Sequence, residues 1–561
     1  MREFDRRTVL RYSGIAAASM MLRGERFAFG EDAPMATTAA GKVSGRVENG
    51  INVFRGIPYG EDTKKTRFKA PLPVAAWSGV KECVEWSTRA PQLTGERAGR
   101  GAAASGEPER VGFHLPPDKG EQSEDCLHVN VWTPGLRDGK KRAVLFYIHG
   151  GAYNNGTVNC DLYDGNRLCH RGDVVVVTVN HRLNAFGYMY LGDLGGDPGG
   201  KEYADSGNVG MLDIVLALKW VQTNIAEFGG DASRVLIFGQ SGGGAKCATL
   251  MAMPAAKGLF HRVVTMSGQQ VTAKPTVIAT EVTKDVLDKL GVKYDQLDAL
   301  TTLPMEKIQE AARVSSAWLP VRDGGALPRD PFDPDAPGIS AGVPMILANT
   351  HDETVTSAAG RIGVLTWEQA PEALKNSVGQ YLGSYTPEEI IRRYREIYPE
   401  RDAAHVVVAA AVAFRAWPGQ VIEADRRAAD AKSQAHTWVY RIDWKVPFPG
   451  GGGQNWALHT IDLPFVFDNV ALAPGMCGAS AEEQAAAQPL ATRMSEMLIA
   501  FAKTGNPNCK AIPQWPSYDL KERNTMIFDS KTGDNESRVE KNPRGAERVF
   551  AAGAHYRQPG T

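Results

Sequence analysis

The chain has 561 residues and a formal net charge of −1, because 63 Lys and Arg residues nearly balance 64 Asp and Glu residues. This balance leaves no broad basic surface, so nucleic acid is not an expected partner. Apolar residues make up 43% of the chain, and a core of that size needs neither a metal nor disulfides to fold. None of the seven cysteines stands in a CxxC pair, which argues against a structural zinc site.

The first 30 residues have the pattern of an export signal. Arg6 and Arg7 stand together before a weakly apolar run, Tyr12–Leu22, which is too short to span a bilayer. The adjacent arginines in DRRTVLR indicate the twin-arginine type of signal, with cleavage after residue 30 or near Ala40. No other segment is both apolar and long enough to cross a membrane. We therefore expect a soluble periplasmic or secreted bacterial protein without stable membrane insertion.

Alternating strand and helix patterns predict an α/β fold. Five short apolar runs between turn residues are expected to be buried strands: Ala143–His149, Val174–Asn180, Val235–Gly239, Pro344–Ala348 and Thr437–Asp443. Two longer patterns, Val209–Phe228 and Ala481–Lys503, are expected to be helices. This alternation favours a central, mostly parallel, doubly wound sheet with helices on both faces. Large irregular loops are expected at Arg97–Gln122, Leu194–Asn208 and Phe448–Asn455, and no linker divides the chain into independent domains.

The strongest local motif is GQSGG, which places Ser241 between a predicted strand and a predicted helix. This strand–turn–helix setting is the one that a nucleophilic serine of the G-x-S-x-G type requires. The turn is sharp, so the residues two positions away, Gly239 and Gly243, have to be small. The N-terminus of the following helix favours the negative charge that develops during attack.

A glycine-rich turn after the strand AVLFYI is the candidate oxyanion hole. Its sequence is HGGAY, and glycines there let backbone N–H groups approach a substrate oxygen. We expect N–H donors from Gly151 and Ala152, and a third from Gly242, the residue after the nucleophile. The alternative is an ordinary glycine turn, which its position upstream of the serine disfavours.

A serine nucleophile needs a histidine base and an acid that orients it. In this strand–turn–helix setting the acid and the histidine follow the serine in that order. His459 follows the glycine loop and precedes the apolar stretch IDLPFVF, whereas a single histidine is more often structural. The acid is expected in NTHDET at the end of a predicted strand, and spacing alone leaves Asp352 and Glu353 both open.

With these motifs in place, the chain resembles the type B carboxylesterase (cholinesterase-like) family of α/β-hydrolases. The similarity runs over residues 41–555 as one domain and is carried, in family order, by FRGIPYG, SEDCLHVNVWTP, HGGAYNNG, VNHRLNAFGY, SGNVGMLD, FGGD, FGQSGGG, FAKTGNPN and WPSY. The resemblance implies Ser241 as nucleophile, Glu353 rather than Asp352 as the acid, and His459 as the base. It also implies a supporting or structural role for Ser267 in TMSGQ.

The chain departs from the family pattern at several positions. Ala152 stands where the family has the third glycine of GGG, and Gly242 replaces a usual alanine, an exchange expected to be harmless. Gln240 replaces a usual glutamate, which argues against a preference for cationic substrates. Cys126 matches a family disulfide cysteine, but its usual partner position holds Ala90, so that Cys126 is either free or paired with Cys83.

The expected function is therefore that of a serine carboxylesterase acting on small ester substrates through an acyl-enzyme, with no cofactor and no metal. Activity is expected to fall at low pH as His459 becomes protonated. The main alternative is an amide or carbamate hydrolase with the same triad. A remote alternative is a non-catalytic binding module, which the presence of all three triad residues disfavours.

Overall fold

The structure is a computed structural model. It describes residues 33–93, 115–195, 200–355, 365–433, 436–446, 456–529 and 537–559. The expected export signal and the expected loop Phe448–Asn455 lie outside the described residues. Of the other two expected loops, residues 94–114 and 196–199 also lie outside them.

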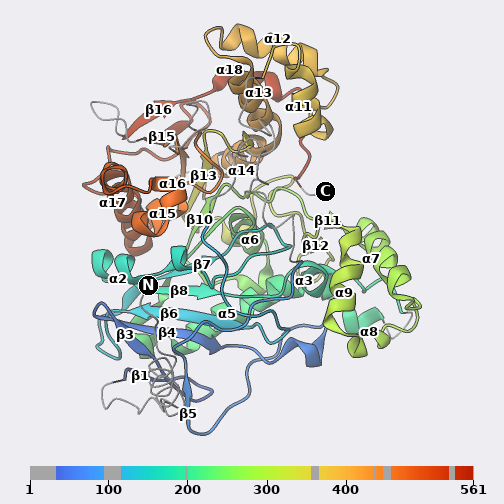
Figure 1. Ribbon diagram of the computed structural model, residues 1–561, viewed down its shortest axis with the longest axis vertical. Helices are drawn as coiled ribbons and strands as arrows, with labels where there is room; N and C mark the ends of the chain where they lie inside the picture. The colour runs from blue at the N-terminus through green and yellow to red at the C-terminus, as the bar shows by residue number, and fades with distance from the viewer. Residues whose placement is uncertain are drawn as a thin grey trace, which may run out of the picture.

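An eleven-stranded sheet forms the centre of the molecule (Figure 1). All pairs from β15 to β8 are parallel, whereas β16 at one edge and β6, β4 and β3 at the other pair antiparallel. The mostly parallel sheet confirms the expected fold class. In spatial order the strands are β16 (Ser537–Lys541), β15 (Asn524–Phe528), β14 (Thr437–Ile442), β13 (Met345–Thr350), β10 (Arg262–Met266), β9 (Gly230–Gln240), β7 (Arg142–Ile148), β8 (Val175–Val179), β6 (His128–Thr133), β4 (Ile51–Pro58) and β3 (Arg46–Glu48).

Two small sheets accompany the large one, and helices cover it. The small sheets contain β1 (Met35–Thr37), β2 (Lys42–Ser44) and β5 (Val80–Glu82), and β11 (Lys274–Pro275) with β12 (Val321–Arg322). The α-helices are α2 (Asn166–Gly172), α3 (Asn184–Tyr188), α5 (Val209–Asn224), α6 (Gly242–Leu250), α7 (Thr276–Leu290), α8 (Ala299–Thr302), α9 (Met305–Ala311), α11 (Ala370–Val378), α12 (Pro387–Ile397), α13 (Ala403–Ala411), α14 (Trp417–Ala429), α15 (Leu463–Val466), α16 (Pro474–Cys477), α17 (Ala481–Thr504) and α18 (Gly545–Ala551).

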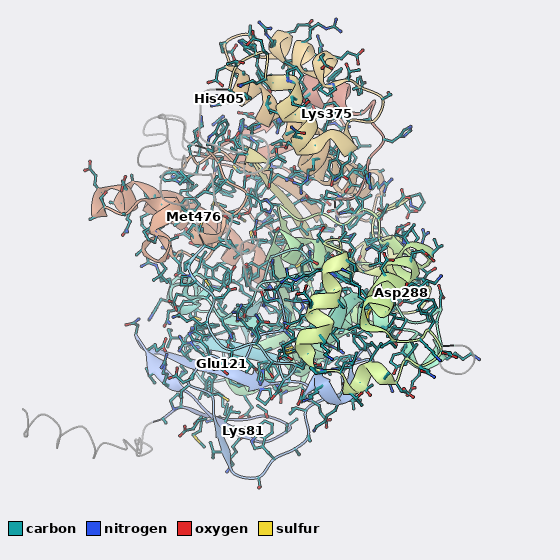
Figure 2. The ribbon with its side chains drawn as sticks, turned by 45° about the vertical axis from the view of Figure 1, so that its right-hand side comes forward. Lys81, Glu121, Asp288, Lys375, His405 and Met476 are labelled. Carbon is teal, nitrogen blue, oxygen red and sulfur yellow. The ribbon has the colours of Figure 1, made fainter. Side chains whose placement is uncertain are left out.

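Helices α11, α12, α13 and α18 gather at one end of the molecule, and the three-stranded sheet lies at the other (Figure 1). Figure 2 shows the same separation, with Lys375 and His405 on the helical end and Lys81 on the opposite end. A single turn of π-helix, Val412–Ala416, joins α13 to α14. The large sheet therefore lies between a helical end and an end that carries the three-stranded sheet.

Side chains of the central strands alternate between two apolar clusters, one on each face of the sheet. In β7, Leu145 and Tyr147 belong to one cluster, while Val144, Phe146 and Ile148 belong to the other. The first cluster includes side chains of α13 and α17, and the second includes side chains of α5 and α6. This alternation follows from the two-residue period of a strand. It explains why the central strands are apolar at nearly every position and confirms helices on both faces.

The predicted elements agree closely with the observed ones. Four of the five predicted strands match β7, β8, β13 and β14 to within two residues at each end, and β9 begins earlier, at Gly230. Helix α17 begins after Ser480, which forms a capping box with Glu483, and ends at Gly505, whose φ is 78°. These cap residues satisfy the N–H and C=O groups that a helix leaves without partners at its ends.

Two helical stretches, Gly200–Phe228 and Ala403–Ala429, meet the length and hydropathy expected of a membrane span. This corrects the expectation that no segment beyond the export signal is long and apolar enough. In the two apolar windows, 67% and 61% of the residues are buried inside the protein. Both stretches contribute side chains to the apolar clusters that cover the sheet.

The two cysteines with an uncertain pairing are both free thiols. Cys83 and Cys126 are buried, and neither forms a disulfide. Burial raises the pKa of the Cys83 thiol to about 12, which makes it a poor nucleophile at neutral pH. The fold is therefore held by packing and polar contacts rather than by this covalent link.

A buried ion pair joins two of the family-like motifs, VNHRLNAFGY and SGNVGMLD. The Arg182 guanidinium donates to both carboxylate oxygens of Asp213, with its shortest contact at 2.6 Å, and to the carbonyl of Lys69 at 2.9 Å. The side chains are 1% and 0% exposed. A buried ion pair is costly to break, because removing one partner leaves the other charge buried and uncompensated.

We expect Asp213→Ala to lower the free energy of unfolding by about 3–5 kcal/mol, the usual cost of an uncompensated buried charge. Equilibrium urea unfolding followed by tryptophan fluorescence would measure it. The matched control is Glu281→Ala, which breaks the more exposed pair with Lys284 at 2.8 Å and should cost less than about 1 kcal/mol. Equal losses in the two variants would contradict the assigned role of the buried pair.

Candidate active site

Ser241 lies in the sharp turn between β9 and α6, as the motif predicted. Its backbone adopts φ 56° and ψ −125°, a left-handed conformation that side-chain-bearing residues adopt only under strain. A Cβ on Gly239 would lie 2.4 Å from the carbonyl carbon of Gly243, and a Cβ on Gly243 would lie 2.0 Å from the carbonyl oxygen of Ile148. The two flanking glycines are therefore a steric requirement of the turn.

The structure brings the three predicted triad residues together. The Nε2 atom of His459 lies 2.8 Å from the Ser241 hydroxyl, and its Nδ1 atom contacts the carboxylate of Glu353. A carboxylate accepts the hydrogen bond, so the ring donates through Nδ1 and accepts from the serine through Nε2. The His459 side chain is 19% exposed and that of Glu353 only 1%, so the acid is buried whereas the base is accessible to solvent.

Glu353 follows β13 and is fixed through both carboxylate oxygens. Oε2 contacts His459, and Oε1 accepts hydrogen bonds from Asn349 Nδ2 at 2.9 Å and from the Thr350 N–H at 2.7 Å. These bonds leave the carboxylate little freedom to rotate away from the imidazole. The last residues of β13 thus fix the orientation of the Glu353 carboxylate.

Asp352, the residue that spacing alone could not exclude, points elsewhere. Its Oδ2 atom accepts from the Ala457 N–H at 2.9 Å, and its Oδ1 atom lies 2.6 Å from Nδ1 of His351. The Asp352 N–H in turn donates to the Ala457 carbonyl at 3.2 Å. Asp352 therefore anchors the segment just before His459, and Glu353 is the carboxylate that reaches the imidazole.

Gln240 holds the same segment from the other side. Its side-chain amide donates to the carbonyl oxygen of His459 at 2.6 Å, and its side chain is buried. A Cβ on Gly150 would lie 3.2 Å from the Gln240 amide oxygen, so the side chain fills the space beneath the glycine-rich turn. An ionised glutamate carboxylate at this position could not donate this hydrogen bond. The glutamine is visible in the sequence, but this contact is not, because it joins residues 219 positions apart.

The glycine-rich turn and the start of α6 place the expected oxyanion donors side by side. Gly151 and Ala152 have φ values of 88° and 53°, and their N–H groups form no hydrogen bond with other described residues. Gly242 is the first residue of α6, where N–H groups have no acceptor within the helix. A Cβ on Gly242 would lie only 2.1 Å from the Ala152 carbonyl oxygen. Glycine here is thus more than a harmless exchange, because this approach of the two segments requires it.

Two buried histidines support the turn. His149 stacks on His181 with ring centroids 4.7 Å apart, and its Nδ1 donates to the Gly150 carbonyl at 2.8 Å. Burial lowers the pKa of His149 to about 3 and that of His181 well below its usual range. Both rings are therefore neutral at physiological pH and act as packing and hydrogen-bonding groups.

Ser267 supports the site through its backbone. Its N–H donates to the Ala348 carbonyl at 2.8 Å, while its hydroxyl finds no hydrogen-bond partner among the described residues. The neighbouring Gly268 is the tighter requirement, because a Cβ there would lie 1.7 Å from the Ser241 carbonyl oxygen. The sequence pattern did not single out Gly268.

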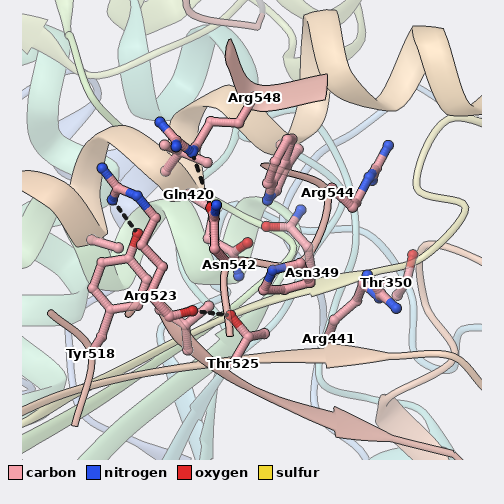
Figure 3. A pocket seen from close by; sticks show the side chains of 15 residues that line it. Asn349, Thr350, Gln420, Arg441, Tyr518, Arg523, Thr525, Asn542, Arg544 and Arg548 are labelled. Atoms are coloured by element: carbon pink, nitrogen blue, oxygen red, sulfur yellow. Dashed lines mark hydrogen bonds between the residues drawn. The ribbon is translucent and has the colours of Figure 1, made fainter. Parts of the chain in front are cut away.

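A small cavity lies beside Asn349, the residue that donates to Glu353 (Figure 3). Its volume is about 30 Å³, room for about two water molecules, which is too small for an ester substrate. Four arginines line it, and carboxylates of Asp443, Asp425 and Glu547 pair with three of them: Arg441, Arg523 and Arg544. The cavity is therefore part of an ion-pair network behind the acid rather than a substrate pocket.

We expect Gln240→Glu to lower kcat for p-nitrophenyl acetate about tenfold, because a carboxylate would face the His459 carbonyl without a proton to donate. Folding should persist, because glutamate and glutamine side chains have nearly the same size and shape. Steady-state kinetics and circular dichroism would test both statements. Gln222→Glu, at a distant amide that bonds the carbonyls of Ala232 and Leu259, is the matched control. Wild-type kcat in the Gln240→Glu variant would contradict the positioning role.

Comparison with known proteins identifies the family of the chain. The model of the carboxylesterase family matches residues 32–550. A para-nitrobenzyl esterase of Bacillus subtilis (strain 168) is 34% identical over 520 residues, covering 90% of this chain and 97% of that protein. A phenmedipham hydrolase of Pseudarthrobacter oxydans is 30% identical, covering 86% and 93%. The crystal structure of a Geobacillus stearothermophilus carboxylesterase has a TM-score of 0.75 and 32% identity, covering 92% of this chain and 99% of that one. The chain belongs to the carboxylesterase family.

Proposed function

We propose that the protein is a serine carboxylesterase that hydrolyses carboxylic esters through a covalent acyl-enzyme. The observation that carries the proposal is the hydrogen-bonded chain from Ser241 through His459 to Glu353. A serine in a strained turn, an imidazole at 2.8 Å and a buried carboxylate behind it are the parts that acyl transfer needs. Membership of the carboxylesterase family supports the choice of esters as substrates.

In the first step, the Ser241 oxygen attacks the ester carbonyl carbon while its proton passes to Nε2 of His459. The carbonyl π electrons move to oxygen, and the N–H groups of Gly151, Ala152 and Gly242 stabilise the resulting oxyanion. Collapse of the tetrahedral intermediate breaks the bond to the alcohol, which leaves with the proton held by His459. Water then attacks the acyl-enzyme by the same route and releases the acid and the free serine.

Glu353 has two tasks in this scheme. It holds the imidazole in the tautomer that accepts the serine proton, and it stabilises the imidazolium that forms transiently. Its bonds to Asn349 and to the Thr350 N–H keep it ready for both tasks before substrate arrives. The triad therefore needs no metal or organic cofactor for the proposed chemistry.

Fluorophosphonate labelling of the purified protein tests the nucleophile. We expect a stoichiometric covalent adduct on Ser241 in peptide mapping, and no adduct with Ser241→Ala. Parallel rates on a matched ester and amide should favour the ester, whose alkoxide leaves more readily than an amide nitrogen. A folded wild-type protein that takes no label, or that is labelled at another residue, would refute the proposal. A non-catalytic binding role would then have to be considered. Faster amide cleavage would reassign the substrate class.

The acid assignment has its own matched pair of variants. Glu353→Gln should lower kcat about 10³–10⁴-fold, because the neutral amide neither fixes the tautomer nor stabilises the imidazolium. Asp352→Asn keeps an oxygen that can accept from the Ala457 N–H, so its kcat should remain within about threefold of wild type. Steady-state hydrolysis of a p-nitrophenyl ester measures both, and the reverse ranking would make Asp352 the triad acid.

We further propose that the twin-arginine pattern at Arg6 and Arg7 directs export, so that the protein acts outside the cytoplasm. Replacing both residues with lysine should keep the full-length protein in the cytoplasmic fraction, since the signal is read through its arginines. Cell fractionation with immunoblotting in a bacterial host measures the distribution. Arg2→Lys is the control, and export of the double variant at the wild-type level would refute the proposal.

A further inference from the structure

Lys246 is a fully buried lysine one helical turn after the nucleophile, and neither the triad nor the oxyanion donors account for it. It lies in α6 with 0% of its surface exposed. Its Nζ atom donates to the carbonyl oxygen of Ala152 at 2.6 Å and to that of Gly242 at 3.3 Å. It also lies 4.8 Å from the centre of the Tyr153 ring. One ammonium group thus contacts both segments that carry the expected oxyanion donors.

No carboxylate accounts for the burial of this lysine. Across the part of the chain that the structure describes, its polar contacts are the two carbonyls, and its charged state has no acidic side chain paired with it. Burial accordingly lowers the pKa of Lys246 to about 7. Burial also lowers the pKa of His149 and His181, the two histidines that support the turn. A buried amine without an ion pair suggests a task served by its N–H groups.

The two segments that Lys246 joins are pressed together. The Ala152 carbonyl faces the Cα of Gly242 so closely that a Cβ at Gly242 would lie 2.1 Å from the oxygen. Ala152 itself is held at φ 53°, which a residue with a side chain adopts only when its surroundings enforce it. The hydrogen bond from Lys246 to the Ala152 carbonyl fixes the peptide unit just after that strained residue. It therefore opposes relaxation of the turn away from the nucleophile.

We propose that Lys246 is a positioning residue of the oxyanion hole. By bonding the carbonyls of Ala152 and Gly242 together, it fixes the spacing of the N–H groups of Gly151, Ala152 and Gly242. The proposal rests on the function proposed above, because it assigns those N–H groups to the oxyanion. Such donors stabilise the transition state only if they are already aimed at the position that the oxyanion occupies. Among the described residues, Lys246 forms hydrogen bonds to two backbone carbonyls and to neither Ser241 nor His459, so it acts through the backbone.

The role predicts a specific kinetic signature. Loss of the two hydrogen bonds from Lys246 should destabilise the tetrahedral intermediate and leave ground-state binding of the substrate nearly unchanged. Lys246→Met keeps an unbranched, flexible side chain of similar volume, one atom shorter, and removes its N–H donors. We expect this variant to lower kcat at least about tenfold with KM within about twofold, since loss of one complete donor costs about 10²–10³ in kcat. The affinity for a trifluoromethyl ketone, which forms a tetrahedral adduct with the serine, should fall by the same factor as kcat/KM.

Cys247→Ala is the matched control. Cys247 neighbours Lys246 on α6 and is equally buried, but it makes no contact with the two carbonyls among the described residues. Its truncation should lower the thermal midpoint while kcat and the inhibitor affinity stay near wild type. A purely structural lysine would behave in the same way. A Lys246→Met variant that lowers only the thermal midpoint would therefore overturn the proposal.

Lys246→Gln provides a second variant in case the methionine variant does not fold. Its amide keeps N–H donors but is one bond shorter, so it cannot reach both carbonyls. We expect a loss in kcat of about threefold with a parallel loss of trifluoromethyl ketone affinity. A wild-type kcat, or a change in KM alone, would refute the proposal. Wild-type enzyme that hydrolyses esters and labels at Ser241 keeps the proposed function intact in either event.

Discussion

The backbone turn at Ser241 is the constraint on which the rest of the site depends. Its left-handed conformation lifts the hydroxyl above the end of the sheet, and the strain is sustained only because three glycines admit neighbouring backbone. Gly239 and Gly243 let the turn close, and Gly268 lets the next strand end beside the serine carbonyl. Each of these positions would clash with a single added Cβ. The position of the nucleophile is thus set by backbone contacts rather than by side-chain packing.

Parallel strands then bring the acid and the base to the same place. Strands β9 and β13 both pair with β10, so their carboxyl ends, which carry Ser241 and Glu353, open on the same edge of the sheet. His459 arrives on a segment outside the sheet and needs separate anchors. Asp352 holds the N–H of Ala457, and Gln240 holds the carbonyl of His459 itself. The buried side chains of Asp352 and Gln240 therefore position the histidine, whereas the sheet positions the serine and the acid.

The electrostatics around the nucleophile involve buried basic groups whose pKa values are lowered by burial. Burial keeps His149 and His181 uncharged and lowers the pKa of Lys246 to about 7. Because residue 240 is glutamine rather than glutamate, the residue just before the nucleophile carries no negative charge. A developing oxyanion therefore meets oriented N–H groups without a fixed negative charge beside them.

The sequence by itself determined the fold class, the bounds of the main strands and the serine, because apolar periodicity and the glycine pattern around Ser241 are local signals. It also narrowed the acid to two adjacent carboxylates and, through family resemblance, selected Glu353 and His459. Only the tertiary structure decided what Asp352, Gln240, Gly268 and Lys246 contact. The contacts that matter for the site are with backbone atoms of segments distant along the chain: Asp352 with Ala457, Gln240 with His459, Gly268 with Ser241 and Lys246 with Ala152. Such contacts leave no periodicity in the sequence, since any residue supplies a carbonyl or an N–H.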